Sequence, residues 1–137
     1  MSISKTYLKD LVYNVNGAAI EVHKFLGPGL LESVYQKCMV KELTDRGFDI
    51  KSELVIPIDY KGLEVEAGLR CDLLVENSLA VELKSVDVIK PIFEAQLLTY
   101  MKLLKVPIGL MINFNVTNIY REGQKTYVNE IYRDLED

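Results

Sequence analysis

Two short apolar segments that contain charged side chains most constrain how this chain can fold. Residues 69–75 and 79–86 are rich in Leu and Val and are separated by the polar sequence Glu-Asn-Ser. Apolar runs of this length around a short polar turn are typical of a β-hairpin with enclosed strands. Charged groups are costly to enclose, so the embedded Asp72, Glu82 and Lys84 need a physical reason.

The length of the turn decides whether these charged residues meet. With a three-residue loop, Asp72 lies directly opposite Glu82, and opposite residues share one face of the sheet. Arg70 then lies opposite Lys84. With a two-residue loop, Asp72 lies opposite Leu83 and points to the other face. Apolar neighbours favour an enclosed site, whereas acids and lysines on a strand more often form a solvated edge, so the residues alone leave both interpretations open.

The convergent register would place two carboxylates close enough to repel each other, and partial burial would add a desolvation cost. A divalent cation relieves both costs. Oxygen ligands from two carboxylates, with water and phosphate in the remaining positions, are typical of a Mg²⁺ site. A nearby lysine can position water or stabilise charge on a phosphate.

The rest of the chain predicts helices on either side of further strands. Apolar spacing indicates helices at about residues 7–26 and 30–46, the second capped by Gly47, and a third from Pro91. Further strands are expected at 52–60, 63–66 and 107–114, with a short one between 115 and 132. This order predicts a mixed α/β (α+β) fold, a central mixed β-sheet flanked by helices, in a single domain over residues 1–137.

Composition narrows the functional classes. Of the 137 residues, 49% are hydrophobic and 26% are charged, as in ordinary globular domains. No apolar run approaches the roughly 20 residues that span a bilayer, and neither a signal peptide nor a disulfide framework is evident. We therefore expect a cytoplasmic protein with no membrane partner. Because the net charge is −4, binding a polyanion requires local positive groups or bound cations.

Three motifs resemble known nuclease families. The spacing D-x9-E-x-K, formed by Asp72, Glu82 and Lys84, resembles the PD-(D/E)XK nuclease superfamily. Residues 29–35 (GLLESVY) match the G-x-x-E-x-x-Y pattern of the GxxExxY family, and residues 96–100 (QLLTY) match the Q-x3-Y motif of the RecB-like branch. The resemblance implies a restriction-endonuclease-like core, αβββαβ, here with an extra N-terminal helix.

The resemblance also implies a set of metal ligands. Asp72 and Glu82 would bind Mg²⁺, for which Mn²⁺ can substitute, and the backbone carbonyl of Leu83 would complete the inner shell. Glu32 would reach the metal directly or through water, although an acid in the first turn of a helix is favourable in any case. Tyr35 is expected to be structural rather than catalytic, and it would brace the Glu32 carboxylate through a hydrogen bond.

Catalytic and substrate contacts follow from the same resemblance. Lys84 would be the catalytic lysine. Gln96 and Tyr100 share a helix face and would orient Lys84, water or a phosphate, while ordinary packing is the alternative. Arg70 and Lys90 are candidate phosphate contacts, with solvated surface charge as the alternative.

The resemblance implies a Mg²⁺-dependent nuclease that hydrolyses phosphodiester bonds in DNA. Two other classes stay open. One is a catalytically inactive nuclease-fold module that binds nucleic acid. The other is a protein-interaction module, for which a homodimer through Tyr- and Leu-rich surfaces is an option.

Overall fold

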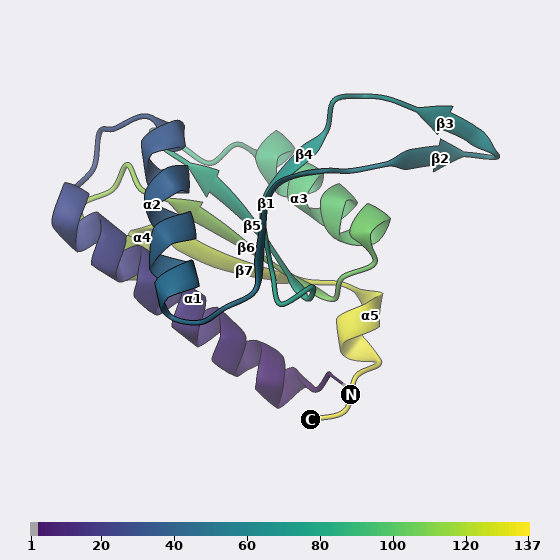
Figure 1. Ribbon diagram of the computed structural model, residues 1–137, viewed down its shortest axis with the longest axis horizontal. Helices are drawn as coiled ribbons and strands as arrows, with labels where there is room; N and C mark the ends of the chain where they lie inside the picture. Colours follow the sequence, from purple (N-terminus) through teal and green to yellow (C-terminus); the bar gives the residue numbers. More distant parts are fainter. Residues whose placement is uncertain (1–2) are drawn as a thin grey trace.

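A five-stranded mixed sheet forms the centre of the computed structural model, which describes residues 3–137 (Figure 1). In spatial order its strands are β1 (Ile50–Val55), β4 (Arg70–Val75), β5 (Leu79–Lys84), β6 (Ile108–Asn113) and β7 (Gln124–Val128). Neighbouring strands are antiparallel except β5 and β6, which run parallel. The predicted mixed α/β architecture is therefore confirmed.

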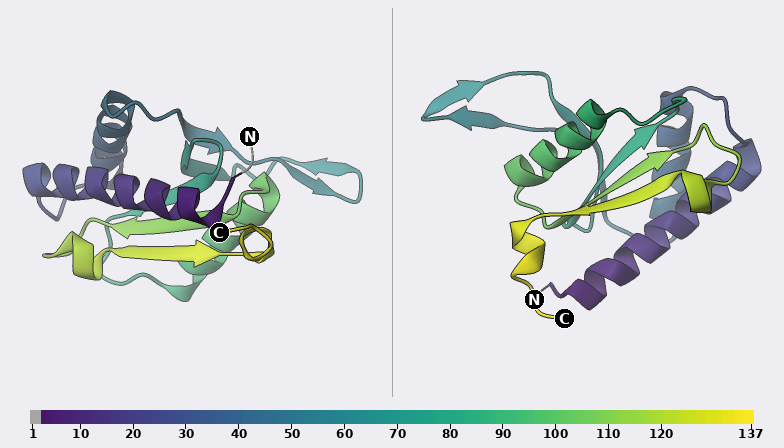
Figure 2. Two further views of the ribbon diagram at one scale, coloured as in Figure 1. Left: turned by 90° about the horizontal axis from the view of Figure 1, so that it is seen from below. Right: turned by 180° about the vertical axis from the view of Figure 1, so that it is seen from behind.

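Helices cover both faces of this sheet (Figure 2). Helices α1 (Lys5–Leu26) and α2 (Glu32–Asp45) pack on one face, and α3 (Pro91–Leu104), the crossover between the parallel strands, packs on the other. Along β5, Val81 and Leu83 join the core under α1 and α2, whereas Ala80 joins the core under α3. Strand β5 is therefore buried on both faces, which explains its continuous apolar character.

The helix boundaries follow from local capping. The Ser4 hydroxyl accepts a hydrogen bond from the N–H of Tyr7 at the start of α1. As predicted, Gly47 follows α2, with a φ of 90° that favours glycine, and Pro91 lies in the first turn of α3. Two short helices not predicted from the sequence, α4 (Ile119–Glu122) and α5 (Glu130–Arg133), are each capped by a preceding asparagine. Within residues 3–137, none of the helices has the length and apolar character needed to span a bilayer.

The prediction of one strand over residues 52–60 is wrong. Strand β1 ends at Val55, before Pro57, and the chain then forms a separate hairpin of β2 (Ile58–Tyr60) and β3 (Leu63–Val65). This hairpin projects away from the central sheet (Figures 1 and 2). At its base, the N–H of Ile56 donates to the carbonyl of Leu69 at 2.9 Å, which returns the chain to β4.

Candidate functional site

The β4–β5 hairpin has the register that directs Asp72 toward Glu82. Val75 pairs with Leu79 across a three-residue turn, and regular pairing continues for two further pairs. The three-residue loop, one of the two alternatives left open by the residues, is therefore the one that forms.

Strand β4 leaves regular pairing at Asp72. On the β5 side, the last regular pair is Leu73 with Val81. On the β1 side, the pairing skips Glu53 and Asp72, although the register is the same before and after them. Glu53 has a φ of 49°, in the left-handed region that strains a residue with a side chain. Asp72 thus has no regular pairing partner on either β1 or β5.

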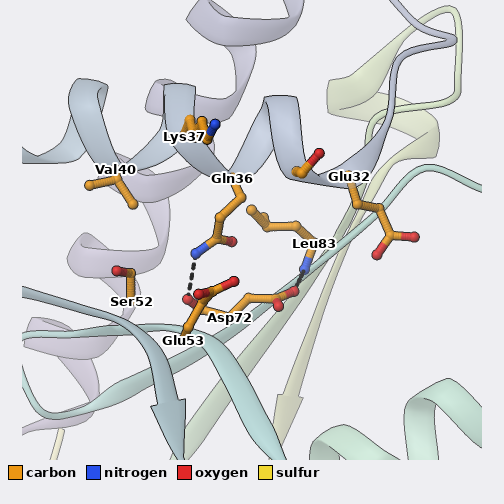
Figure 3. A pocket seen from close by; sticks show the side chains of 9 residues that line it. Glu32, Gln36, Lys37, Val40, Ser52, Glu53, Asp72 and Leu83 are labelled. Atoms are coloured by element: carbon orange, nitrogen blue, oxygen red, sulfur yellow. Dashed lines mark hydrogen bonds between the residues drawn. The ribbon is translucent and has the colours of Figure 1, made fainter.

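Side chains replace the missing strand hydrogen bonds around Asp72. Its N–H donates to Oε1 of Glu82 at 3.1 Å, and its carbonyl accepts a hydrogen bond from Nε2 of Gln36 at 2.8 Å. Its own Oδ2 accepts the N–H of Leu83 at 2.8 Å (Figure 3). These contacts hold the Asp72 and Glu82 carboxylates in the gap where β4 and β5 separate.

The two carboxylates are largely buried, and the positive charge of Lys84 offsets only part of the cost of ionising them. Burial raises the pKa of Asp72, an effect opposed by the Leu83 hydrogen bond and the charge of Lys84. Burial, followed by the charge of Asp72, raises the pKa of Glu82 to about 8. Glu82 is only 7% exposed, so water screens this repulsion poorly. A bound cation would therefore find two partly desolvated carboxylates beside each other.

A cavity of about 470 Å³ opens beside Asp72, between α2 and the strands β1 and β4 (Figure 3). Its lining comprises Glu32, Ser33, Gln36, Lys37, Val40, Ser52, Glu53, Asp72 and Leu83. The Glu32 side chain is exposed at the start of α2, and its charge contributes to the raised pKa of Asp72. The structure thus brings Glu32, Asp72 and Leu83 to one cavity.

The fit of a metal ion to these residues rests on the chemistry of the donors. Carboxylate and carbonyl oxygens without histidine or cysteine suit Mg²⁺ or Mn²⁺ rather than Zn²⁺. One buried acceptor at the cavity, Oε1 of Gln36, has no hydrogen-bond partner. Over residues 3–137, however, no three Asp, Glu, His or Cys side chains lie close enough together to hold a metal ion. The donor set therefore fits a hard cation, but Glu32 would have to turn toward the Asp72–Glu82 pair to join it.

Lys84 and Tyr100 lie on the α3 side of the same strands. The Lys84 amine is 4.3 Å from the centre of the Phe93 ring, and its charge acts on both Asp72 and Glu82. Tyr100 is buried, and its burial and the charge of Glu82 raise its pKa. These two side chains are therefore near the acids.

The other predicted contacts lie outside this group. Gln96 is exposed on α3. Arg70 is not opposite Lys84, because β4 and β5 separate before reaching it, and it instead lines a second cavity at the base of the β2–β3 hairpin. Lys90 is exposed where α3 begins.

The prediction that Tyr35 braces Glu32 is wrong. The Tyr35 hydroxyl donates to the carbonyl of Gly27 at 2.6 Å and accepts the N–H of Leu30 at 3.2 Å. Its ring stacks on Phe114 with centroids 4.3 Å apart. Tyr35 therefore holds the loop that leads into α2, and it positions Glu32 only through that loop.

Sequence reasoning missed two residues of the site, Gln36 and Glu53. Gln36 lies one helical turn after Glu32, so its spacing places it on the same face of α2. That signal could have identified it. The left-handed backbone of Glu53 has no signal in the sequence, since glutamate rarely adopts it.

The comparison with known families agrees with this geometry. A model of the PD-(D/E)XK nuclease superfamily matches residues 9–126, a range that includes every acid of the cavity. No curated protein and no solved structure matches the chain. The assignments to the GxxExxY family and to the Q-x3-Y branch stay predictions. Because the matched range spans most of the 137 residues, the chain belongs to the PD-(D/E)XK nuclease superfamily.

Proposed function

We propose that this chain is a single-domain, Mg²⁺-dependent nuclease that hydrolyses phosphodiester bonds in DNA, and that Mn²⁺ can replace Mg²⁺. The observation that carries the proposal is the pair of interlocked carboxylates, Asp72 and Glu82, where β4 leaves regular pairing. Membership of a nuclease superfamily whose enzymes generally use divalent metals and act on nucleic acid supports it. Residues 29–35 and 96–100 favour a GxxExxY protein with a RecB-like motif.

Four groups would hold the cation: the Asp72 and Glu82 carboxylates, the Leu83 carbonyl and Glu32. Glu32 is exposed, so its side chain can turn toward the other two acids at small cost. When bound, the cation would supply Lewis-acid chemistry that activates water and stabilises charge on the phosphate.

Lys84 would act from the α3 side. Its contact with Phe93 keeps the amine near the acids, and an interaction of this kind is worth about 0.5–2 kcal/mol. The amine can therefore leave the ring for water or a phosphate oxygen.

Tyr100 would orient this amine, and Gln96 would contact the substrate from the exposed side of α3. Arg70 and Lys90, both outside the cavity, would bind phosphates away from the cleaved bond.

A nuclease assay with matched variants tests the proposal. Supercoiled DNA, linear duplex, single strands and RNA are incubated with Mg²⁺, with Mn²⁺ or with EDTA. We expect cleavage of DNA that requires the cation and that falls by about 100-fold or more in Asp72→Asn and Lys84→Met, because each removes a charge acting on the transition state.

Asp10→Asn and Lys9→Met are the controls, since both residues are exposed on α1 and carry the same chemical changes. They should cleave as the wild type does. Equal cleavage by all five proteins would assign the activity to a contaminant, and cleavage of RNA alone would overturn the choice of DNA.

A second candidate is a nuclease-fold module that binds nucleic acid or protein without cleaving. The observation that favours it is the lack of three metal-binding side chains in one place over residues 3–137. Calorimetric titration separates the two candidates. Mn²⁺ binding that disappears in Asp72→Asn supports the nuclease, whereas DNA retention with no metal binding supports the module.

A further inference from the structure

The side-chain amide of Gln36 spans from helix α2 to the point where β4 leaves regular pairing. Its Nε2 donates to the backbone carbonyl of Asp72 at 2.8 Å (Figure 3). A carbonyl can only accept a hydrogen bond, so this contact decides which end of the amide is nitrogen. Together with Glu82, which accepts the Asp72 N–H, Gln36 binds both backbone polar groups of Asp72.

The other end of the amide, Oε1, is buried without a hydrogen-bond partner. Leaving such an acceptor unsatisfied is unfavourable, so an arrangement that supplies a donor is favoured. The nearby acids accept when ionised, and the Leu83 N–H already donates to Asp72. Among residues 3–137 no group donates to this oxygen, so a water molecule that enters the cavity would satisfy it.

Hydrated divalent cations supply such donors. Mg²⁺ usually keeps several water molecules when it binds a protein, and water coordinated to a cation donates hydrogen bonds outward. A cation bound by Asp72 would bring its hydration shell to the cavity that Gln36 and Asp72 both line.

We propose that Gln36 is a positioning residue of this metal site, an inference that rests on the proposed function. Through Nε2 it fixes the backbone of Asp72 outside the regular sheet, and through Oε1 it accepts a hydrogen bond from the hydration shell of the cation. Helix α2 thus contributes two groups one turn apart: Glu32, which binds the cation, and Gln36, which binds its water.

Metal affinity, measured without any catalytic assay, tests this role. Mn²⁺ is titrated by calorimetry into the wild type, Gln36→Met, Gln36→Glu and the control Ser33→Ala, which lies on the same helix and lines the same cavity. We expect Gln36→Met, similar in shape but unable to make either hydrogen bond, to weaken Mn²⁺ binding about 10-fold or more, as for other residues that orient a metal site. Gln36→Glu loses the contact to the Asp72 carbonyl but keeps an acceptor at the position of Oε1 and adds negative charge, so it should weaken Mn²⁺ binding less than Gln36→Met does. Ser33→Ala should leave affinity unchanged.

Thermal unfolding in EDTA accompanies each titration and identifies any variant that does not fold. If Gln36→Met is one, Gln36→Asn takes its place with the same expectation. Wild-type affinity in the Met or Asn variant overturns the role of Gln36 and leaves the proposed nuclease intact. Equal weakening in the Met and Glu variants overturns the assignment of Oε1. A wild-type protein that binds no Mn²⁺ overturns the proposed function, and this inference with it.

Discussion

At the scale of single residues, Asp72 is held by side chains at a place where a strand is normally held by its neighbours. Glu82 and Gln36 bind its backbone, and Leu83 binds its carboxylate. These contacts hold the carboxylates of Asp72 and Glu82 close together and shield them from water. Their protonation should therefore be coupled to folding.

Glu82 should make stability depend on pH. Its folded-state pKa of about 8 lies above its ordinary value of 4.5. Between these values the folded state binds more protons than the unfolded state, so the free energy of unfolding falls as pH rises from about 4.5 to about 8. In EDTA, Glu82→Gln should lose much of this dependence and be at least as stable as the wild type at pH 8.5, because the amide carries no charge to desolvate.

Urea unfolding at pH 5 and at pH 8.5 measures the effect. The control is Glu21→Gln, an exposed acid on α1, which should keep the wild-type dependence. An identical pH dependence in Glu82→Gln and the wild type would show that Glu82 ionises normally.

At the scale of elements, helix α2 is placed by the loop before it. Tyr35 contacts Gly27 and Leu30 through its hydroxyl, and the hydroxyl of Ser85 donates to the carbonyl of Leu30 at 2.6 Å. The loop therefore sets where α2 begins, and with it the position of Glu32 and Gln36 over β4.

Tyr35→Phe should lower the free energy of unfolding by about 1–3 kcal/mol, because the Gly27 carbonyl and the Leu30 N–H lose a partly buried partner. Urea denaturation measures this loss. Tyr13→Phe, at a tyrosine that is 75% exposed, should change stability by less than about 0.5 kcal/mol. A Tyr35→Phe protein as stable as the control would show that the hydroxyl does not hold the loop.

Much of the fold could be predicted from the sequence because periodicity reports which faces are buried. The three long helices and the strand at residues 107–114 could be predicted in this way, whereas the length of the turn at residues 76–78 stayed open. The strand at 52–60 was not, since its apolar residues continue past Pro57 although the chain leaves the sheet there. Periodicity shows that a segment is extended but not which strand it pairs with.

The site was predictable only in part for a related reason. The sequence predicted that Asp72 lies opposite Glu82 only if the turn has three residues, and the structure decides that point. The end of regular pairing depends on the left-handed Glu53 and on side chains from α2, which meet β4 only in the folded molecule. The contacts of Gln36 and Tyr35 are likewise tertiary, and no local pattern in the sequence specifies them.

At the scale of the whole molecule, the β2–β3 hairpin stands apart from the body that carries the site (Figure 1). Its side chains are largely exposed, including Tyr60 at 61% and Leu63 at 63%. Two-stranded hairpins of this size contribute little stability by themselves. The central sheet should therefore fold without it.

Replacing residues 57–68 with a two-residue Asn-Gly turn tests this independence. Ile56 and Leu69 are already hydrogen-bonded at 2.9 Å, so a tight turn can join them. The shorter loop costs less closure entropy, and we expect the free energy of unfolding to stay within about 1 kcal/mol of the wild type. Circular dichroism with urea, followed by Mn²⁺ titration, checks the fold and the site. A shortened protein that fails to fold would show that the hairpin belongs to the core structure.

The two ends of the described chain lie side by side (Figure 1). The N–H of Lys5 donates to the carbonyl of Glu136 at 2.8 Å, and the Thr6 hydroxyl donates to the carbonyl of Asp137. A fluorescent label or a surface tether attached at either end would consequently emerge from the same corner of the molecule. Immobilisation through the N-terminus or through the C-terminus would therefore hold the protein in the same orientation toward a substrate in solution.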